Sequence, residues 1–316
     1  MIGVGVDIGG TFIKFMAVTP EGGIIKEDKI PTMPQEGPKA FLDRIGGVLN
    51  DWTTLFKGKK LVVGIGIAGD VDPVKGMLRF SPNLNKCRNV HITEPLEKMT
   101  GLPCVAENDA NMAAWGAYDF ELKGKYPSVL TITLGTGVGG GIVLDRKLYH
   151  GATGSAGEVG HIKITIDGEL CACGNRGCLE AYISNAAITR RAEQALLKAP
   201  DKSILKKMCS DGRVTTLALS QAADEGDPIA LSIWKESGTY LGRGIADIIL
   251  VLNPDALLFT GGVSGAAKHF FPAMQEVFAQ TSITTPFKHL KVAAASTPNL
   301  GGIGAALYAL EHYKEK

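Results

Sequence analysis

Three of the six cysteines in this chain lie within one eight-residue segment, C-A-C-G-N-R-G-C, as Cys171, Cys173 and Cys178. Thiols at this spacing could form a disulfide, act as a redox pair or bind a metal ion. The N-terminal sequence has no basic region, and Asp7 interrupts its first apolar run, so we expect no secretory signal peptide. We therefore expect a reducing cytoplasm, where metal or redox chemistry is favoured over disulfides.

Three glycine-rich turns form a second set of residues that could do chemistry. They read D-I-G-G-T at 7–11, L-G-T-G-V-G-G-G at 134–141 and T-G-G-V-S at 260–264. Each adjoins an apolar run typical of a strand, and glycine lets backbone amides approach phosphate oxygens closely. A carboxylate such as Asp7 beside a phosphate requires an intervening cation, which suggests Mg²⁺ bound through water. An ordinary hairpin is the alternative for any one turn, and none is a P-loop or a Rossmann fingerprint.

A third candidate is the pair Asn108 and Asp109 in A-E-N-D-A-N, where a predicted strand ends and a helix begins. Asp109 is well suited to cap that helix, which would be a structural role. A carboxylate near phosphate-binding turns can also be the base that receives a hydroxyl proton during phosphoryl transfer. The residues alone leave both roles open.

The apolar patterns predict the α/β elements that must position these residues. Strands are expected at about 2–10, 12–20, 22–30, 60–69, 103–109, 128–145 (two strands around a glycine turn), 256–264 and 291–297. Helices are expected at about 37–57, 92–101, 109–118, 179–198, 228–250 and from 303 onwards. Asp227 is the expected cap of the fifth helix, with Pro228 at its first position. The strand–turn–strand pattern occurs twice, at 2–20 and 128–145, which suggests a duplicated lobe.

The composition excludes several classes of protein. The chain is 45% hydrophobic and 21% charged, with a formal net charge of +1, which is typical of a globular protein with a full core. So small a charge creates no strong overall field for nucleic acid or an anionic membrane, and neither is an expected partner. The most apolar internal stretch, 244–259, contains two aspartates, an asparagine and a proline, so it is not a membrane span. The length suits two domains, with a boundary in the polar segment 118–125.

Taken in order, eight motifs resemble the ROK family of sugar kinases and sugar-responsive repressors, and most of all its bacterial glucokinases. They are D-I-G-G-T, G-I-A-G, P-N-L, E-N-D-A-N, L-G-T-G-V-G-G-G, G-E-V-G-H, C-A-C-G-N-R-G-C-L-E and F-T-G-G-V-S. The resemblance implies a two-lobed, actin-like (hexokinase or RNase H-like) ATPase fold with a cleft between the lobes. The small α/β lobe would comprise 1–118 with the C-terminal helix 301–316, and the large lobe 119–300 with the metal loop. A homo-oligomer, dimer or tetramer, is also implied.

Both the resemblance and the donor chemistry favour a structural zinc at the cysteine cluster. His161 precedes Cys171 by ten residues, and one His with three Cys forms a closed four-coordinate site. A Cys171–Cys178 disulfide, or thiols unrelated to one another, are the alternatives. A closed site cannot activate water, so its expected task is positioning. By resemblance, Glu158, His161 and Glu180 bind the sugar, with His161 using one ring nitrogen for zinc and the other for a hydroxyl.

The resemblance makes Asp109 the catalytic base and Asn108 the ligand of a neighbouring sugar hydroxyl. Gly69 would lie against the sugar ring and Asn83 would contact the sugar through its amide. The residues implied to face the ATP phosphates and Mg²⁺ are Asp7, Gly9, Gly10, Thr11, Thr133, Gly135, Thr136 and Gly137, and those facing the adenosine are Gly261, Gly262 and Val263. Lys14, near the first turn, is expected to be an exposed strand residue.

The implied activity is ATP-dependent phosphorylation of the 6-hydroxyl of a hexose, with glucose as the favoured substrate. N-acetylmannosamine, N-acetylglucosamine, fructose and allose stay open, because these sugars differ from glucose by one substituent or the arrangement of a few hydroxyls. A repressor of the family would carry a winged helix before the first glycine turn, and Asp7 leaves no space for one. A non-catalytic sugar sensor is the remaining alternative, which the presence of Asp109 and of the glycine turns disfavours.

Overall fold

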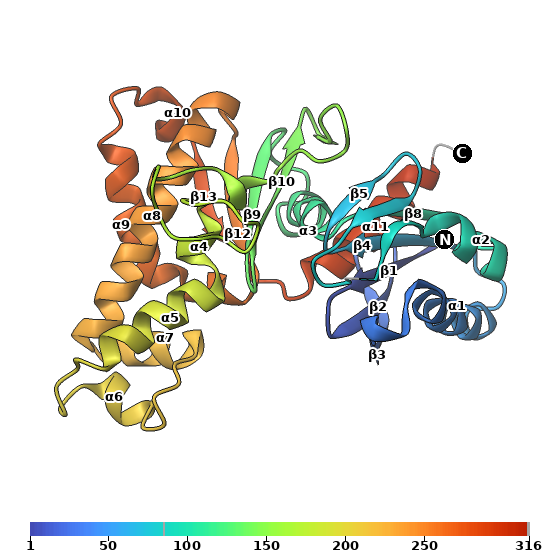
Figure 1. The fold of residues 1–316 in the computed structure, drawn as a ribbon. Helices are drawn as coiled ribbons and strands as arrows, with labels where there is room; N and C mark the ends of the chain where they lie inside the picture. The colour runs from blue at the N-terminus through green and yellow to red at the C-terminus, as the bar shows by residue number, and fades with distance from the viewer. Residues whose placement is uncertain (85, 315–316) are drawn as a thin grey trace. The chain divides into compact units, whose positions relative to one another are not determined.

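The structure is a computed structural model, and it describes residues 1–84 and 86–314. The described strands form two five-stranded sheets and one three-stranded sheet (Figure 1). The first sheet has the order β3 (Ile24–Pro31), β2 (Phe12–Val18), β1 (Ile2–Ile8), β4 (Leu61–Ile67), β8 (Cys104–Asn108). The second has the order β11 (Lys147–Leu148), β10 (Val138–Leu144), β9 (Val129–Leu134), β12 (Ala256–Thr260), β13 (Lys291–Ala294). Numbered along the chain within each sheet, both orders are 3-2-1-4-5, which agrees with the repeated pattern in the sequence.

The chain divides into two compact units. The first unit comprises Met1–Thr131, Gly141–Gly157 and Ser296–Lys316, and the second comprises Ile132–Gly140 and Glu158–Ala295. The C-terminal helix belongs to the first unit, as expected from the resemblance. The division does not coincide with the polar segment at 118–125: it falls within β9 and β10, inside continuous apolar runs that carry no linker signal.

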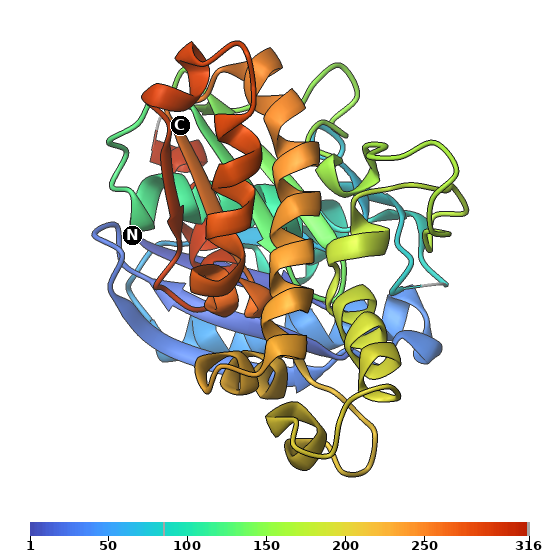
Figure 2. The ribbon, with the colours of Figure 1, turned by 90° about the vertical axis from the view of Figure 1, so that its left-hand side faces the viewer.

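Eleven α-helices are described, and most lie where the sequence predicts them. They are α1 (Pro38–Leu55), α2 (Thr93–Thr100), α3 (Asp109–Gly116), α4 (Glu180–Ile183), α5 (Asn185–Leu196), α6 (Ile204–Met208), α7 (Thr216–Asp224), α8 (Pro228–Leu252), α9 (Ala267–Ala279), α10 (Thr285–Lys288) and α11 (Leu300–Lys314). Asp227 caps α8 by accepting hydrogen bonds from the amides of Ile229 and Ala230. The α8 and α9 helices lie side by side in the second unit (Figures 1 and 2).

The prediction of one helix over 179–198 is wrong. Ser184 is extended and interrupts it, and its hydroxyl accepts a hydrogen bond from the amide of Ala187 to cap α5. A serine cap of this kind competes with continued helix, because its side chain satisfies an amide that has no partner in the first turn. The sequence analysis also omitted the three-stranded sheet of β5 (Asp70–Asp72), β6 (Met77–Phe80) and β7 (Arg88–His91), whose strands are too short for a clear alternation.

The carboxyl end of the first sheet is the edge that matters for the site. Strands β1, β4 and β8 are parallel, and Ile8, Ile67 and Asn108 lie level across them. The three turns that follow these strands therefore emerge at one edge, which is where ligands bind in sheets of this kind. In the described part of the chain no helix is both long and apolar enough to cross a bilayer.

The α11 helix packs on β1 and β4 through glycines that allow the backbones to approach closely. A Cβ added at Gly64 would stand 1.8 Å from the carbonyl oxygen of Ala305, and one at Gly5 would stand 1.9 Å from that of Gly302. No side-chain rotation relieves such a clash, because both obstacles are backbone atoms. This contact fixes the returning C-terminal helix against the sheet.

We expect Gly64→Ala to lower the free energy of unfolding by about 3 kcal/mol, near the upper end of the range for overpacking, because α11 must move to admit one methyl group. Gly47→Ala is the matched control: Gly47 is exposed on α1 with no atom within 4 Å of an added Cβ. The control should be stabilised by about 0.5–1 kcal/mol through helix propensity. Chemical denaturation of both variants measures the difference, and equal stability would contradict this account of the packing.

Candidate functional site

The structure brings the four predicted metal ligands together in the second unit. The ligand atoms of His161, Cys171, Cys173 and Cys178 all lie within 4.8 Å of one another. Cys173 Sγ and Cys178 Sγ are 3.7 Å apart, and Cys171 Sγ is 3.8 Å from His161 Nδ1. Sulfurs bound tetrahedrally at about 2.3 Å from zinc would be about 3.8 Å apart. The distance between Cys173 Sγ and Cys178 Sγ matches this spacing, so the cluster fits a tetrahedral zinc site, and no two of the six cysteines are joined in the structure.

The pKa values of two thiols in this cluster are shifted in opposite directions. Burial raises the pKa of Cys171 to about 12. A hydrogen bond from the backbone amide of Asn175 lowers the pKa of Cys173 to about 6. A bound divalent cation would hold all three as thiolates. The sequence analysis missed Lys163, whose Nζ donates to Cys178 Sγ at 2.8 Å and adds a positive charge beside that sulfur.

His161 presents its two ring nitrogens to different neighbours. Nδ1 faces Cys171, as given above, and Nε2 lies 4.0 Å from Glu158 Oε2. Glu158 is half-exposed and precedes the 3-10 turn Val159–His161. A metal on Nδ1 would therefore leave Nε2 directed toward the same region as the Glu158 carboxylate.

Glu180 links the cysteine loop to the second glycine turn. Its Oε2 accepts a hydrogen bond from the amide of Val138 at 2.9 Å, and Cys171 Sγ lies 3.5 Å from its Oε1. A Cβ at Gly137 would stand 2.6 Å from Glu180 Oε2, so this approach depends on glycine. Sequence alone did not predict this contact, since the two segments are 42 residues apart.

The third glycine turn lies against the second one within the same unit. Gly261 has φ of +90°, and a Cβ there would stand 2.3 Å from the carbonyl oxygen of Leu134. Gly262 is exposed while Val263 is buried. In the second turn Gly135 donates to the carbonyl of Gly137 at 3.0 Å, and Thr136 is exposed whereas Thr133 is partly buried. The predicted nucleotide residues of the second unit are thus adjacent.

In the first unit, Asn108 and not Asp109 caps α3. The Asn108 side-chain oxygen accepts from the amides of Ala110 at 2.8 Å and Asn111 at 3.2 Å. Its Nδ2 donates to the carbonyl of Gly69 at 2.9 Å. The alternative that Asp109 caps this helix is therefore wrong, because the helix begins one residue earlier, at Asp109 itself. Asp109 is the first helical residue and is not used as the cap.

Gly69 and Asn83 lie close to Asn108 and to the first glycine turn. Gly69 has φ of +146°, and a Cβ there would meet the carbonyl oxygen of Phe80 at 2.4 Å, so glycine is required. A Cβ at Gly10 would stand 3.2 Å from that of Asn83. Within the first turn, Gly9 donates to the carbonyl of Phe12 at 3.0 Å, and Thr11 is exposed.

Asp7 has a cationic neighbour that the sequence analysis read only as an exposed strand residue. Lys14 lies opposite Asp7 in the β1–β2 pair, with Nζ 3.7 Å from Asp7 Oδ2 and 3.3 Å from Asn299 Oδ1. Burial raises the pKa of Asp7, and Lys14 opposes that effect. A Cβ at Gly301 would stand 4.0 Å from Asp7 Cγ and 3.9 Å from the Asp109 carbonyl, so both acids flank the start of α11. A partly buried carboxylate of this kind is a suitable ligand for Mg²⁺, directly or through water.

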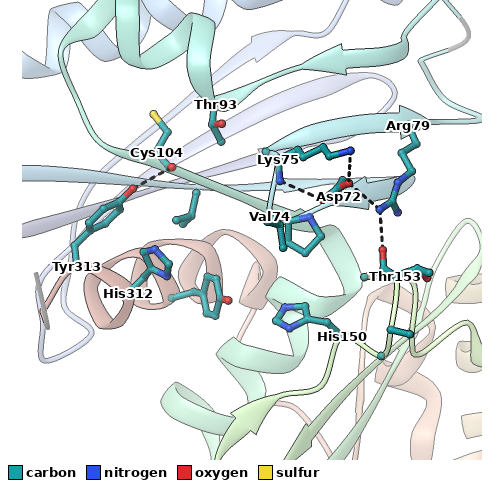
Figure 3. A pocket seen from close by; sticks show the side chains of 17 residues that line it. Asp72, Val74, Lys75, Arg79, Thr93, Cys104, His150, Thr153, His312 and Tyr313 are labelled. Atoms are coloured by element: carbon teal, nitrogen blue, oxygen red, sulfur yellow. Dashed lines mark hydrogen bonds and ion pairs between the residues drawn. The ribbon is translucent and has the colours of Figure 1, made fainter.

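A cavity of about 870 Å³ lies in the first unit, at a location separate from the predicted site residues (Figure 3). None of the predicted site residues lines it. Its described lining includes Cys104, at the start of β8, whereas Asp109 follows the end of that strand. A search guided by cavity size alone would therefore miss the residues at the carboxyl end of the first sheet, such as Asn108 and Asp109.

The two sheets and their connections define a two-lobed, actin-like ATPase fold, with glycine-rich turns in each unit. The family model described as ROK family matches residues 3–312. The chain belongs to the ROK family.

Three relatives illustrate the similarity. A glucokinase of Streptomyces coelicolor is 39% identical over 265 residues, which cover 83% of this chain and 82% of the relative. An N-acetylmannosamine kinase of Escherichia coli is 30% identical over 311 residues, covering 98% and 99%. The crystal structure of a ROK family glucokinase from Streptomyces griseus in complex with glucose and AMPPNP has a TM-score of 0.83 at 36% identity, covering 98% of this chain and 100% of that one. The relatives support a sugar kinase and leave the sugar open.

Proposed function

We propose that this protein is an ATP-dependent hexose kinase that converts glucose to glucose 6-phosphate. The observation that carries the proposal is the turn after β8. There Asp109 is the first residue of α3 and follows Asn108, at the same edge of the sheet where β1, the strand of Asp7, also ends. The likeness to glucokinases favours glucose over other hexoses.

In the proposed reaction the sugar O6 attacks the γ-phosphorus of ATP, and the bond from that phosphorus to the β,γ-bridging oxygen breaks. Asp109 accepts the O6 proton as the new O–P bond forms, and ADP leaves with the electron pair of the broken bond. Asn108, Asn83 and the backbone of Gly69 are proposed to hold the sugar from the first unit. Glu158, His161 and Glu180 are proposed to bind its other hydroxyls.

The metal ions would have separate tasks. Zinc held by His161, Cys171, Cys173 and Cys178 would keep His161 and Glu180 in place, which lowers the entropy lost on binding sugar. Mg²⁺ near Asp7 would neutralise phosphate charge when ATP is bound. The glycine turns named above are proposed to bind the nucleotide, with phosphates at the first two and adenosine at Gly261, Gly262 and Val263. The expected dimer or tetramer remains a prediction that light scattering can test.

A panel of sugars with ATP tests the proposal. Glucose, N-acetylmannosamine, N-acetylglucosamine, fructose and allose are each supplied at equal concentration, and ADP release is measured by a coupled assay. We expect glucose to give the highest kcat/KM. A higher value for another sugar would reassign the substrate within the same activity. Absence of turnover on every sugar, with sugar binding seen by calorimetry, would make the protein a sensor.

A further inference from the structure

An ion pair between a buried carboxylate and a partly exposed histidine adjoins the turn that carries Asn108 and Asp109. Glu107, the preceding residue on β8, has 1% of its side chain exposed, and its Oε1 lies 2.5 Å from His150 Nε2. Its Oε2 accepts hydrogen bonds from Asn111 Nδ2 at 3.1 Å and from the backbone amide of Asn108 at 3.3 Å. One carboxylate therefore touches the turn at its first residue and again one helical turn later.

The partners of this carboxylate cannot be exchanged for water at low cost. Glu107 and Asn111 are each 1% exposed. A buried carboxylate is tolerated only when a cation and hydrogen-bond donors surround it, and removal of one partner leaves an uncompensated charge. When it is protonated, the imidazole of His150 is the cation in contact with Glu107. The conformation of the turn therefore depends on whether His150 is protonated.

His150 is itself held by the loop that contains it. Arg79 Nη2 donates to the carbonyl of Thr153 at 2.8 Å, and the Ser155 hydroxyl donates to Asp70 Oδ1 at 2.9 Å (Figure 3 shows the first contact). These bonds attach the loop to the β5–β6 hairpin within the first unit. His150 thus has a fixed backbone from which to reach Glu107.

Two hollows, of about 870 Å³ and 600 Å³, share His150 in their linings. Glu107 packs against the ring as its ion-pair partner. The other titratable and charged residues of these linings are Asp72, Lys75, Arg79, Cys104, Arg146, Lys147, Tyr308, Glu311, His312 and Tyr313. Arg79 is paired with Asp70 and Asp72, and Lys75 lies 4.0 Å from Asp72. Glu107 lies at contact distance from the His150 ring in the described part of the chain.

The contact with the carboxylate of Glu107, which is an acceptor for the His150 ring, raises the pKa of His150 above its ordinary value of 6.5. The imidazolium is present below the raised pKa, and its charge is lost as the pH rises through that value. The stabilisation from the pair is therefore complete in mild acid and is lost on the alkaline side.

We propose that His150 is a positioning residue, whose contact with Glu107 holds the turn carrying Asn108 and Asp109 in the arrangement that phosphoryl transfer requires. This inference rests on the proposed kinase function. It assigns a role in the reaction to a residue on a different loop, one that need not touch either substrate.

His150→Gln tests the proposal, because glutamine keeps an N–H donor but carries no charge. We expect kcat at neutral pH to fall about tenfold, since small displacements of a catalytic group have large effects on rate. The KM for ATP should not change. In the wild-type protein kcat should fall as the pH rises through the pKa of His150, and this fall should be absent in the variant. His312→Gln is the control, because His312 lines the same hollows from a different element, α11. An unchanged kcat and pH profile in His150→Gln, or an equal loss in the control, would overturn the proposal.

A second measurement does not depend on turnover or on the variant folding. In the wild-type protein, the backbone amide signals of Asn108 and Asp109 should shift with pH at the midpoint of the His150 ring signals in an NMR titration. Amide signals that do not follow His150 would sink the inference even if the protein is an active kinase. If no hexose is phosphorylated, the proposed function fails, and the titration still decides whether His150 controls the turn.

Discussion

Asp109→Asn is expected to lower kcat by roughly 10²–10⁴-fold, the range typical of a lost general base. Asparagine has nearly the same shape as aspartate but cannot accept the O6 proton. The substitution leaves the helix cap intact, since Asn108 accepts the amide hydrogen bonds at the start of α3. Chemical denaturation of the same variant separates a loss of chemistry from a loss of stability.

The measurement compares kcat from coupled ADP release with the glucose dissociation constant from calorimetry. Glucose binding should stay within a few-fold of wild type while kcat collapses. Asn108→Ala is the informative comparison: it removes the cap and the bond to Gly69, so it should lose about 1 kcal/mol of stability as well as sugar affinity. A kcat for Asp109→Asn close to wild type would remove Asp109 from its proposed role.

Cys173→Ser is expected to abolish zinc binding and to raise the KM for the sugar about tenfold or more. A hydroxyl is a far poorer zinc ligand than a thiolate. Without the ion, His161 and the loop leading to Glu180 lose the constraint that orients them. Part of the free energy of sugar binding is then used to order these residues, which weakens binding. Elemental analysis of the purified variant measures the zinc, and steady-state kinetics measures the KM.

Cys209→Ser is the matched control for this substitution. Cys209 is also in the second unit, and it is buried, whereas Cys173 is exposed. A general packing defect should therefore be worse in Cys209→Ser, while zinc content should fall only in Cys173→Ser. Full zinc content in Cys173→Ser would show that the ligand set is wrong.

Local patterns explain why much of the scaffold was predictable. The strand at 61–67 is a continuous apolar run and is fully buried. The α8 helix begins after Asp227 and ends at Asn253, which is left-handed, because the cap, the proline and the terminating asparagine are all written in adjacent residues. The four metal ligands were also predictable, because three of them lie within eight residues and thiols are distinctive donors.

Contacts between distant segments could not be read in the same way. The pairing of Lys14 with Asp7 follows from the register of the β1–β2 hairpin, a signal that was available but not used. The contact of Glu180 with Val138 and that of Glu107 with His150 join segments that no local pattern relates.

The sequence by itself determined the family motifs, the α/β elements and the donor atoms of the candidate metal site, because each depends on residues close together in the chain. The tertiary structure decided that Asn108 caps α3, that Glu180 reaches the second glycine turn and that His150 meets Glu107. Which polar groups share a buried space depends on how strands and helices pack, and burial then determines which charges must be paired.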